Sequence, residues 1–265
     1  MNKDHSTQKK YLSCFLENLN AKYTVIDDKT IFIQRKYSLE SEKIVNDVFG
    51  RTWVFMSGKI KTNQFSLGKE NGEKINLPGG NYSAFFPVFC VVEWYLNPGF
   101  YDIEMIASLH EAPKHSPQHP IIFSQNIKGN IFQQLEHFVA NGCGNEYINI
   151  NRSDNHCHLS LRTFEWLKNN YNKPISLSDL AKKFKTSASV LSRYFKKSYG
   201  MSPLEVLHKM RVMSSMSHLL LDKHYVLDVA MDVGYSQSRM YNEHFSQIIG
   251  NQPSTLLKLK VDDQI

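Results

Sequence analysis

Alternation between apolar and polar residues dominates the first half of the chain, from about Lys22 to Phe123. Segments such as KYTVI, TIFIQRKY, RTWVFMSGKI and FCVVEWYL carry this two-residue period, and Gly, Pro, Asn or Asp residues separate them. Many short strands at such spacing are typical of a barrel or a sandwich. We therefore predict a β-rich, barrel-like domain in this half.

The apolar period lengthens to that of a helix after this region. Five apolar residues recur at helical intervals: Ile127, Ile131, Leu135, Phe138 and Val139. Gly142 follows at a place where a helix C-cap is expected. The next stretch is polar and lacks a period, which is typical of a linker. We assign residues 1–144 to the first domain, 145–158 to the linker and 159–265 to a second domain.

Helical periods continue through the second half. LSLRTFEWLKNNY stops before Pro174, SLSDLAKKF opens on a serine cap with an aspartate three residues later, and SASVLSRYFKKSYG ends on Gly200. A longer periodic segment runs from about Pro203 to Leu221. The pattern predicts an all-α second domain.

This second half contains an internal repeat of about fifty residues. Four residues match at that shift: Phe245 with Phe195, Gly250 with Gly200, Pro253 with Pro203, and Leu257 with Leu207. Upstream the shift is one residue shorter, and it pairs Ala230 with Ala181, Val233 with Phe184 and Ser236 with Ser187. Each copy reads as an apolar helix with a small alanine, a tight turn, and a second helix that begins at a serine cap.

The repeat predicts two helix-turn-helix units, at about 177–198 and 226–248. The small alanine permits close helix contact, and Gly234 suits a left-handed turn. We expect the second helix of each unit to bury Leu191 and Phe195, or Tyr241 and Phe245. The opposite faces carry side chains that hydrogen-bond base edges: Ser189, Ser192 and Arg193 in the first unit, and Arg239, Asn242 and Glu243 in the second. Lys196 and Lys197 suit phosphate contacts, or are ordinary solvent-facing residues at a helix end.

Charge is unevenly distributed between the two halves. The net charge is +6, and the part after His158 holds fifteen Lys and Arg against nine Asp and Glu, which accounts for the whole excess. Such asymmetry favours a polyanionic partner for the second half. A basic surface that meets only solvent is the alternative.

Composition argues against several classes of protein. No run approaches the roughly 18 apolar residues that a spanning helix needs, and the N-terminus lacks the apolar core of a signal peptide, so we expect a cytoplasmic protein with no membrane partner. The four cysteines form no C-x-x-C pair, and we interpret them as reduced packing residues. We expect no metal, because His110, His115 and His119 lie in a proline-broken loop without ligand spacing.

From about Leu161 to Lys258 the chain resembles the AraC/XylS family of bacterial transcription regulators. The resemblance rests on RVMSS from Arg211, Leu219, VLDVAMDVGY at 226–235, Tyr241, Phe245, Gly250 and Pro253, in that order. It implies two helix-turn-helix units joined by a long helix, whose second helices enter successive major-groove segments on one face of DNA. It also implies that the six polar residues named above make the base contacts. Glu243, Gln252 and Ser215 depart from the residues usual in the family.

The first half matches the family only in its place in the chain and in its strand-rich sequence pattern. Many members place a small cupin-like barrel and a helical dimerisation element before the DNA-binding part, which implies an α+β protein overall. Six aromatic residues are candidates for an effector pocket: Trp53, Phe55, Tyr82, Phe86, Trp94 and Tyr95. Barrel interiors are normally filled by such side chains, so core packing is the favoured interpretation. The helix at Ile127–Val139 pairs with its counterpart in a dimer or simply covers the barrel.

We therefore predict a sequence-specific DNA-binding transcription regulator, an activator at bacterial promoters, that binds rather than catalyses and needs no cofactor. Its expected partners are double-stranded DNA, RNA polymerase, a small-molecule effector and a second copy of the chain. One alternative is a metal- or sugar-handling enzyme built on the barrel, although two of the central strand segments supply only Glu93 as a ligand. The other is a barrel that binds a protein and no small molecule.

Overall fold

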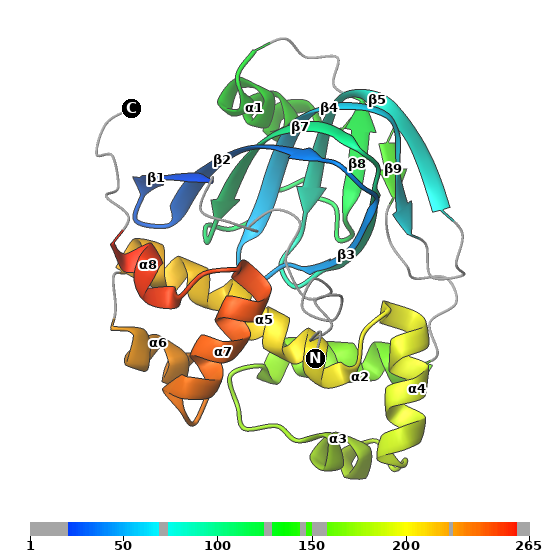
Figure 1. Ribbon diagram of the computed structural model, residues 1–265, viewed down its shortest axis with the longest axis vertical. Helices are drawn as coiled ribbons and strands as arrows, with labels where there is room; N and C mark the ends of the chain where they lie inside the picture. The colour runs from blue at the N-terminus through cyan, green and yellow to red at the C-terminus, as the bar shows by residue number, and fades with distance from the viewer. Residues whose placement is uncertain are drawn as a thin grey trace, which may run out of the picture.

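The computed structural model describes residues 21–68, 74–124, 129–143, 147–149, 158–222 and 225–258. A curved β-sheet from the first half of the chain lies above a group of helices from the second half (Figure 1). This arrangement confirms the predicted α+β organisation, with the strands first and the helices after them.

The strands form one antiparallel sheet. They are β1 (Lys22–Asp27), β2 (Thr30–Leu39), β3 (Lys43–Val48), β4 (Trp53–Gly68), β5 (Lys74–Phe86), β6 (Val91–Leu96), β7 (Gly99–Ser108), β8 (Ile121–Ser124) and β9 (Tyr147–Asn149). Their order is β1-β2-β7-β4-β5-β8-β9, and β6 pairs with both β3 and β4. Within the described residues β1 and β9 end this path without pairing to each other, so the sheet curls like a barrel but stays open.

Strand β4 bends because it contains an irregularity. Its register against β5 shifts between Ile60 and Gln64, and extra residues at such a point increase the local bend and twist. The first part of β4 pairs with β7, and its end reaches β6 at Ser66 and Leu67. The segments RTWVFMSGKI and NQFSLG, which look like separate strands in the sequence, therefore belong to one.

The two faces of the sheet enclose different cores. Val54 and Met56 belong to the main core inside the curve of the sheet, whereas Trp53 and Phe55 belong to a smaller core on the other face. Helix α1 (Ile131–Asn141) covers that smaller core, and the ring of its Phe138 lies 5.4 Å from that of Phe55. Helix α1 therefore covers this face of the sheet within a single chain.

The ends of α1 follow from its sequence. Asn130 caps the first turn together with Gln133, and Gly142 takes a left-handed φ of 71° at the predicted C-cap, where its N–H donates to the carbonyl of Phe138. Ile127, which the sequence pattern places in this helix, lies outside the described residues.

The predicted linker at 145–158 needs one correction. Residues Tyr147–Asn149 form strand β9, which pairs with β8 through Ile122 and Ile148. Ile148 is partly buried against the main core, so an apolar residue within a polar stretch is enough to add a short edge strand.

The second half is helical as predicted. Its helices are α2 (His158–Asn170), α3 (Leu177–Lys183), α4 (Ala188–Tyr199), α5 (Pro203–Ser217), α6 (Val226–Asp232), α7 (Ser238–Ile249) and α8 (Pro253–Leu257), and α5 continues into one π-helical turn, η2 (His218–Asp222). The predicted long helix at Pro203–Leu221 is thus α5 with η2. None of the described helices is both long and apolar enough to cross a membrane.

The helices and the sheet share their apolar cores. Val212 and Met216 of α5 and Phe245 of α7 belong to the same buried cluster as the interior of the sheet. Val48 and Val91, from β3 and β6, join the cluster that holds α2 and α4 together. The two halves of the chain are therefore packed on each other at both helix-turn-helix units.

Candidate nucleic-acid interface

The two helix-turn-helix turns have the same backbone geometry. Lys185 and Gly234 occupy equivalent positions, and both have positive φ, 52° and 93°. The N–H of Thr186 donates to the carbonyl of Ala181 at 3.0 Å, and the N–H of Tyr235 donates to that of Ala230 at 2.9 Å. The repeat found in the sequence is thus a repeat in structure, with a lysine in one copy taking the conformation for which glycine is favoured.

Gly234 is needed for a second reason. A Cβ atom built there would lie 2.7 Å from the backbone carbon of Asn172, which belongs to the connection between α2 and α3. The turn of the second unit therefore packs directly on the connection that leads into the first unit, and a side chain at 234 would force that connection away.

Helix α4 is the second helix of the first unit, and we call it the first reader helix. It begins and exposes its polar face as predicted. Ser187 caps it by accepting from the N–H of Val190 at 3.2 Å, while Leu191 and Phe195 are completely buried. Four of the predicted contact residues are exposed and one, Ser192, is half-buried; the exposed ones are Ser189, Arg193, Lys196 and Lys197. The structure thus brings all five onto one helix.

Helix α7 is the second helix of the second unit, and we call it the second reader helix. It differs from α4 in how it starts. Its N-cap is Gln237, with no side-chain hydrogen bond, whereas the sequence repeat predicted a serine cap at Ser236. The extra residue in this copy moves the start of the helix by one position, which explains the wrong prediction. Tyr241 and Phe245 are completely buried, as expected.

The predicted contact residues of α7 are not equally available. Arg239 and Glu243 are exposed, but the Nε of Arg239 donates to Glu243 Oε1 at 2.9 Å, one helical turn away. Asn242 is half-buried, and its side-chain oxygen is buried with no hydrogen-bond partner among the described residues. The polar side chains of α7 are therefore less available for contacts with a partner than those of α4.

Three further lysines lie in the first helix and the turn of the first unit. Lys182, Lys183 and Lys185 are exposed on α3 and the following turn, and the ammonium of Lys183 lies 5.1 Å from the centre of the Trp166 ring. The signal for them in the sequence was the KKFK run in the turn, which our choice of contact residues passed over. They add positive charge next to α4, as phosphate binding requires.

Helix α5 connects the two units through side-chain hydrogen bonds. Arg211 donates through Nε to the carbonyl of Tyr171 and through Nη2 to that of Lys173, both at 2.7 Å. On the other side, the hydroxyl of Tyr241 donates to Ser215 Oγ at 2.8 Å. Helix α5 is therefore hydrogen-bonded both to the connection that leads into α3 and to α7.

Two histidines pack at the contact of α5 with the second unit. The rings of His208 and His244 lie 3.8 Å apart, and His208 Nδ1 is 3.2 Å from the hydroxyl of Tyr235. Burial, with the charges of His244 and Arg211, lowers the pKa of His208 to about 3. Burial also lowers the pKa of His244. The folded state thus keeps both rings neutral at neutral pH.

The sheet holds α5 from the opposite side. A Cβ atom at Gly50 would lie 2.6 Å from the backbone nitrogen of Ser214, so the loop between β3 and β4 touches the helix backbone. Lys209 is only 3% exposed and donates to the carbonyl of Asn46. Arg51 hydrogen-bonds His218 at 2.8 Å at the end of the helix.

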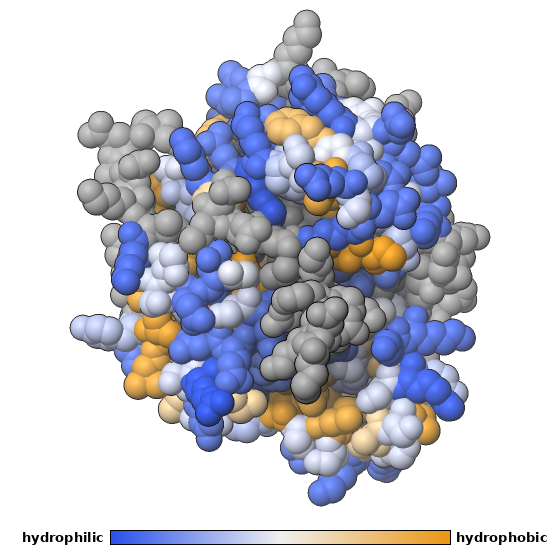
Figure 2. Space-filling model, viewed as in Figure 1, coloured by the Kyte–Doolittle hydropathy of each residue, from blue (hydrophilic) through white to orange (hydrophobic). Residues whose placement is uncertain are grey.

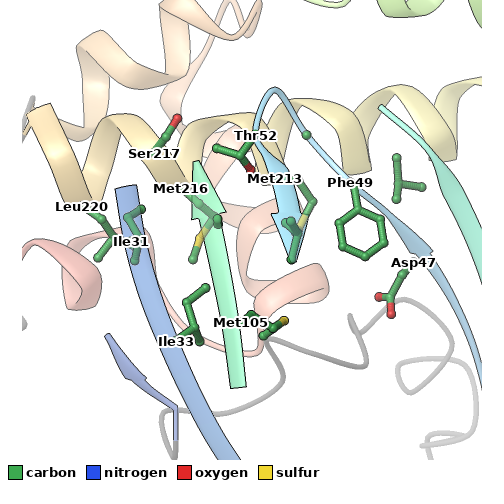
Figure 3. Close-up of a pocket in the computed structure, with 14 residues that line it drawn as sticks. Ile31, Ile33, Asp47, Phe49, Thr52, Met105, Met213, Met216, Ser217 and Leu220 are labelled. Carbon is green, nitrogen blue, oxygen red and sulfur yellow. The ribbon is translucent and has the colours of Figure 1, made fainter. Parts of the chain in front are cut away.

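A small cavity remains between the sheet and α5 (Figure 3). Met213, Met216 and Leu220 line it from the helix side, and Ile31 and Ile33 from β2. Its volume is about 50 Å³, space for one or two water molecules, since water occupies about 30 Å³ in the liquid. It is a gap in side-chain packing at the junction between the sheet and α5.

The six aromatic residues proposed for an effector pocket do not form one. Trp53 and Phe55 lie in the core under α1, while Tyr82, Phe86 and Trp94 lie in the main core, because neighbouring residues of a strand point to opposite faces. Tyr95 lies in a third place, at a polar surface cleft, where the ammonium of Lys74 is 3.8 Å from its ring centre. Alternation along the strands therefore separates these residues.

Comparisons with known proteins agree with this geometry. Residues 180–259 match a family model described as a helix-turn-helix domain. The transcriptional activator RhaS of Yersinia pestis (strain Pestoides F) is 25% identical over 152 residues, 57% of this chain and 52% of that protein. The regulatory protein HptR of Staphylococcus aureus (strain NCTC 8325 / PS 47) is 31% identical over 93 residues, 35% of this chain and 36% of that protein. The chain thus spans about half the length, or less, of these curated relatives.

Among solved structures, the chain is similar to ToxT from Vibrio cholerae O395, which was crystallised with (E)-4-(8-methylnaphthalen-1-yl)but-3-enoic acid. The likeness covers 85% of this chain and 98% of that one, with 12% identity and a TM-score of 0.45.

Proposed function

We propose that this protein is a sequence-specific DNA-binding transcription regulator, because residues 180–259 match a helix-turn-helix family model and the sequence there resembles the AraC/XylS regulators. The observation that carries the proposal is the duplicated turn at Lys185 and Gly234, which supports an exposed polar helix in each unit. A pair of such helices reads two major-groove segments about one helical turn, or 10–10.5 base pairs, apart.

In the proposed complex α4 supplies the stronger half of the recognition. Arg193 reads a guanine, because a bidentate arginine contact is the commonest specific pairing in the major groove. Ser189 and Ser192 adjust the fit to neighbouring bases. Lys196 and Lys197, with the lysines of α3 and its turn, neutralise phosphates and set the register.

The contribution of α7 depends on the pair formed by Arg239 and Glu243. Glu243 either orients Arg239 toward one base or accepts from a cytosine amine itself. In both cases the carboxylate repels phosphates, so α7 adds selectivity and little general affinity.

We extend the proposal to activation through RNA polymerase, with α6 as the contact surface. Tyr225, Leu227 and Met231 of α6 and its N-cap are 81%, 55% and 55% exposed, and Asp228 and Asp232 lie beside them. Figure 2 shows apolar atoms at the surface where Figure 1 places α6. DNA phosphates repel the two acids, so this face suits a protein partner with a complementary basic surface.

The sheet domain is proposed to regulate DNA binding through α5, because Gly50, Asn46 and Arg51 all contact that helix or the turn after it. A small-molecule effector and a second copy of the chain remain proposed partners of this domain. In a dimer, the exposed side of α1 around Val139, which is 45% exposed, is the proposed contact.

The test is selection of bound sequences from a randomised duplex pool by the full chain, at two salt concentrations, with anisotropy titration of the selected duplexes. We expect an enriched motif with two blocks about one helical turn apart. The matched control is the double variant Arg193→Ala/Arg239→Ala, which keeps both helices and loses the preference at the bases that the two arginines contact. Weak, salt-driven binding without a motif would contradict sequence-specific regulation and leave the helix-turn-helix as a fold only.

A further inference from the structure

Each reader helix carries one apolar residue at the same place in the repeat. The fifty-residue shift of the repeat pairs Val190 with Met240. Ser187 is the N-cap of α4 and Gln237 is the N-cap of α7, so Val190 and Met240 are each the third residue of their helix. The repeat therefore places an apolar side chain in the first turn of both reader helices.

Neither of these side chains contributes to a hydrophobic core. The residues that follow them, Leu191 and Tyr241, belong to the buried clusters of the described residues, whereas Val190 and Met240 neither belong to those clusters nor pack against them. Met240 is 45% exposed, and Val190 is half-buried. A single exposed apolar residue needs no explanation, but its occurrence at equivalent positions of both reader helices indicates a shared role.

Met240 lies on the open side of α7. Met240, Glu243 and Gln247 follow one another at intervals of three and four residues, so they form one row along the helix, and all three are exposed. The completely buried Tyr241 and Phe245 form the opposite side. Met240 is the member of the exposed row that is nearest to the start of the helix.

Val190 has the same place on α4. It forms a row with Arg193 and Lys197, again at intervals of three and four residues, and these are the residues proposed above to contact a guanine and a phosphate. When a recognition helix lies in the major groove, the residues near its N-terminus meet the base edges. The first turn of each reader helix thus presents an apolar side chain to the floor of the groove.

Only one group in the major groove is a chemical match for such a side chain. All four bases present hydrogen-bond donors or acceptors there, and thymine alone adds a methyl group, at C5. An apolar side chain against a donor or an acceptor would desolvate it without replacing its hydrogen bond with water. Against the thymine methyl group it removes apolar surface of both partners from water.

We infer that Val190 and Met240 each read the methyl group of a thymine, one in each half of the DNA site. The two thymines lie about one helical turn, or 10–10.5 base pairs, apart, because the two residues are equivalent in the repeat. This inference rests on the proposed DNA-binding function and names the base that the first turn of each reader helix selects.

Replacement of thymine by deoxyuridine tests this inference, because deoxyuridine lacks only the methyl group and pairs with adenine in the same way. Each thymine of the duplex selected from the randomised pool is replaced in turn, and anisotropy titration with the full chain gives the dissociation constant. We expect about fourfold weaker binding at two positions about one helical turn apart, which corresponds to the burial of one methyl or methylene group.

Two variants assign the two positions to their helices. Met240→Ser should bind thymine and deoxyuridine equally at one of the positions and keep the fourfold difference at the other, and Val190→Ser should show the opposite pattern. The difference that each variant keeps shows that it still folds and binds. Ile44→Ser, which removes a 57% exposed apolar side chain from β3, is the matched control and should keep both differences.

The failure of this inference can be told apart from that of the proposed function. If a motif is selected and no replacement of thymine weakens binding, the inference is overturned while sequence-specific binding stands. It is also overturned if Met240→Ser and Val190→Ser keep both differences of the wild type, because other residues then read the methyl groups. If no motif is selected from the pool, the proposed function fails, and the inference fails with it.

Discussion

The hydroxyl of Tyr241 donates to Ser215 Oγ at 2.8 Å, and both side chains are buried. This hydrogen bond joins the second reader helix, α7, to the connecting helix, α5. Ser215 Oγ in turn donates to the carbonyl of Val212 at 2.6 Å. Ser215, a departure from the residue usual in the AraC/XylS family, thus has a specific structural role in this chain.

Removing Ser215 alone should cost at least as much unfolding free energy as removing both partners of this hydrogen bond. Ser215→Ala leaves the Tyr241 hydroxyl buried and unpaired, which costs about 1–3 kcal/mol of unfolding free energy, whereas Tyr241→Phe costs about 1 kcal/mol. The double variant Ser215→Ala/Tyr241→Phe should be no less stable than Ser215→Ala, because no polar group is then orphaned. Urea denaturation of the four proteins measures the coupling, and additive effects would show that the two side chains do not interact.

Arg193→Ala should relax specificity at one base position of the selected site. A bidentate arginine–guanine contact discriminates by about 1–3 kcal/mol, so the preference at that base falls by roughly 5- to 150-fold while preferences elsewhere remain. Anisotropy titration against single-base variants of the site measures this. An unchanged preference at every position would remove Arg193 from the base contacts.

Lys197→Ala provides the contrast to Arg193→Ala. It removes a phosphate contact, so affinity should fall alike for every duplex, and the dependence of log affinity on log salt should become less steep by about one unit. The check is a salt titration on the selected site and on a scrambled duplex. A loss confined to the selected site would place Lys197 on a base.

Glu243→Gln should strengthen DNA binding without changing stability. The pair with Arg239 is exposed, so breaking it changes the unfolding free energy by less than about 1 kcal/mol. Removing a negative charge beside the phosphates raises affinity for all duplexes, most clearly at low salt. Glu40→Gln, in the connection after β2, is the control for loss of one exposed acid. Weaker binding to the selected site alone would instead mean that Glu243 reads a base.

The sequence predicted the second half of the fold well because its signals are local. Capping serines, the buried alanines 181 and 230, and the glycines that end α4 and α7 act within one turn of their own position. Because the two units are repeats, each of these signals occurs at two equivalent positions in the sequence. The cap of α7 was predicted wrongly because the one-residue insertion moves the start of that helix. Comparison of the two copies showed an insertion between Ser236 and Phe245 but not that it lies before the first residue of the helix.

The contacts between the two halves could not be predicted in the same way. The approach of Gly50 to Ser214 and the bond from Lys209 to Asn46 join residues more than 160 positions apart, and no local pattern marks them. The aromatic residues of the sheet show the same limit. Their spacing gives the face of each strand, but the curl of the sheet decides which core that face meets.

Acid should destabilise the fold through the histidines between α5 and α7. Their ordinary pKa is 6.5 when unfolded, and the folded state lowers that of His208 to about 3. The unfolded chain therefore binds more protons between those values, so the unfolding free energy falls as pH drops below 6.5, by up to about 1.4 kcal/mol per pH unit for His208. The lowered pKa of His244 acts in the same direction. Above pH 7 both rings are neutral in either state, and this dependence disappears.

Denaturant midpoints at pH 7.5, 6 and 5 measure this dependence. His208→Gln should flatten the change with pH, although it lowers stability at pH 7.5. His137→Gln, at an exposed position of α1, should keep the slope of the wild type. Equal slopes in all three proteins would mean that other groups cause the acid sensitivity.

Gly50→Ala should loosen the sheet from α5. The added Cβ meets backbone atoms of Met213 and Ser214 at 2.6–2.7 Å, which cannot rotate away, so the loop or the helix must shift. Overpacking of this kind costs about 1–3 kcal/mol. Hydrogen exchange of the α5 amides should rise in this variant. Gly80→Ala is the matched control, since its Cβ meets only the Tyr82 ring at 3.4 Å, and its α5 exchange should stay at the wild-type level. Equal exchange in both variants would show that Gly50 does not hold α5.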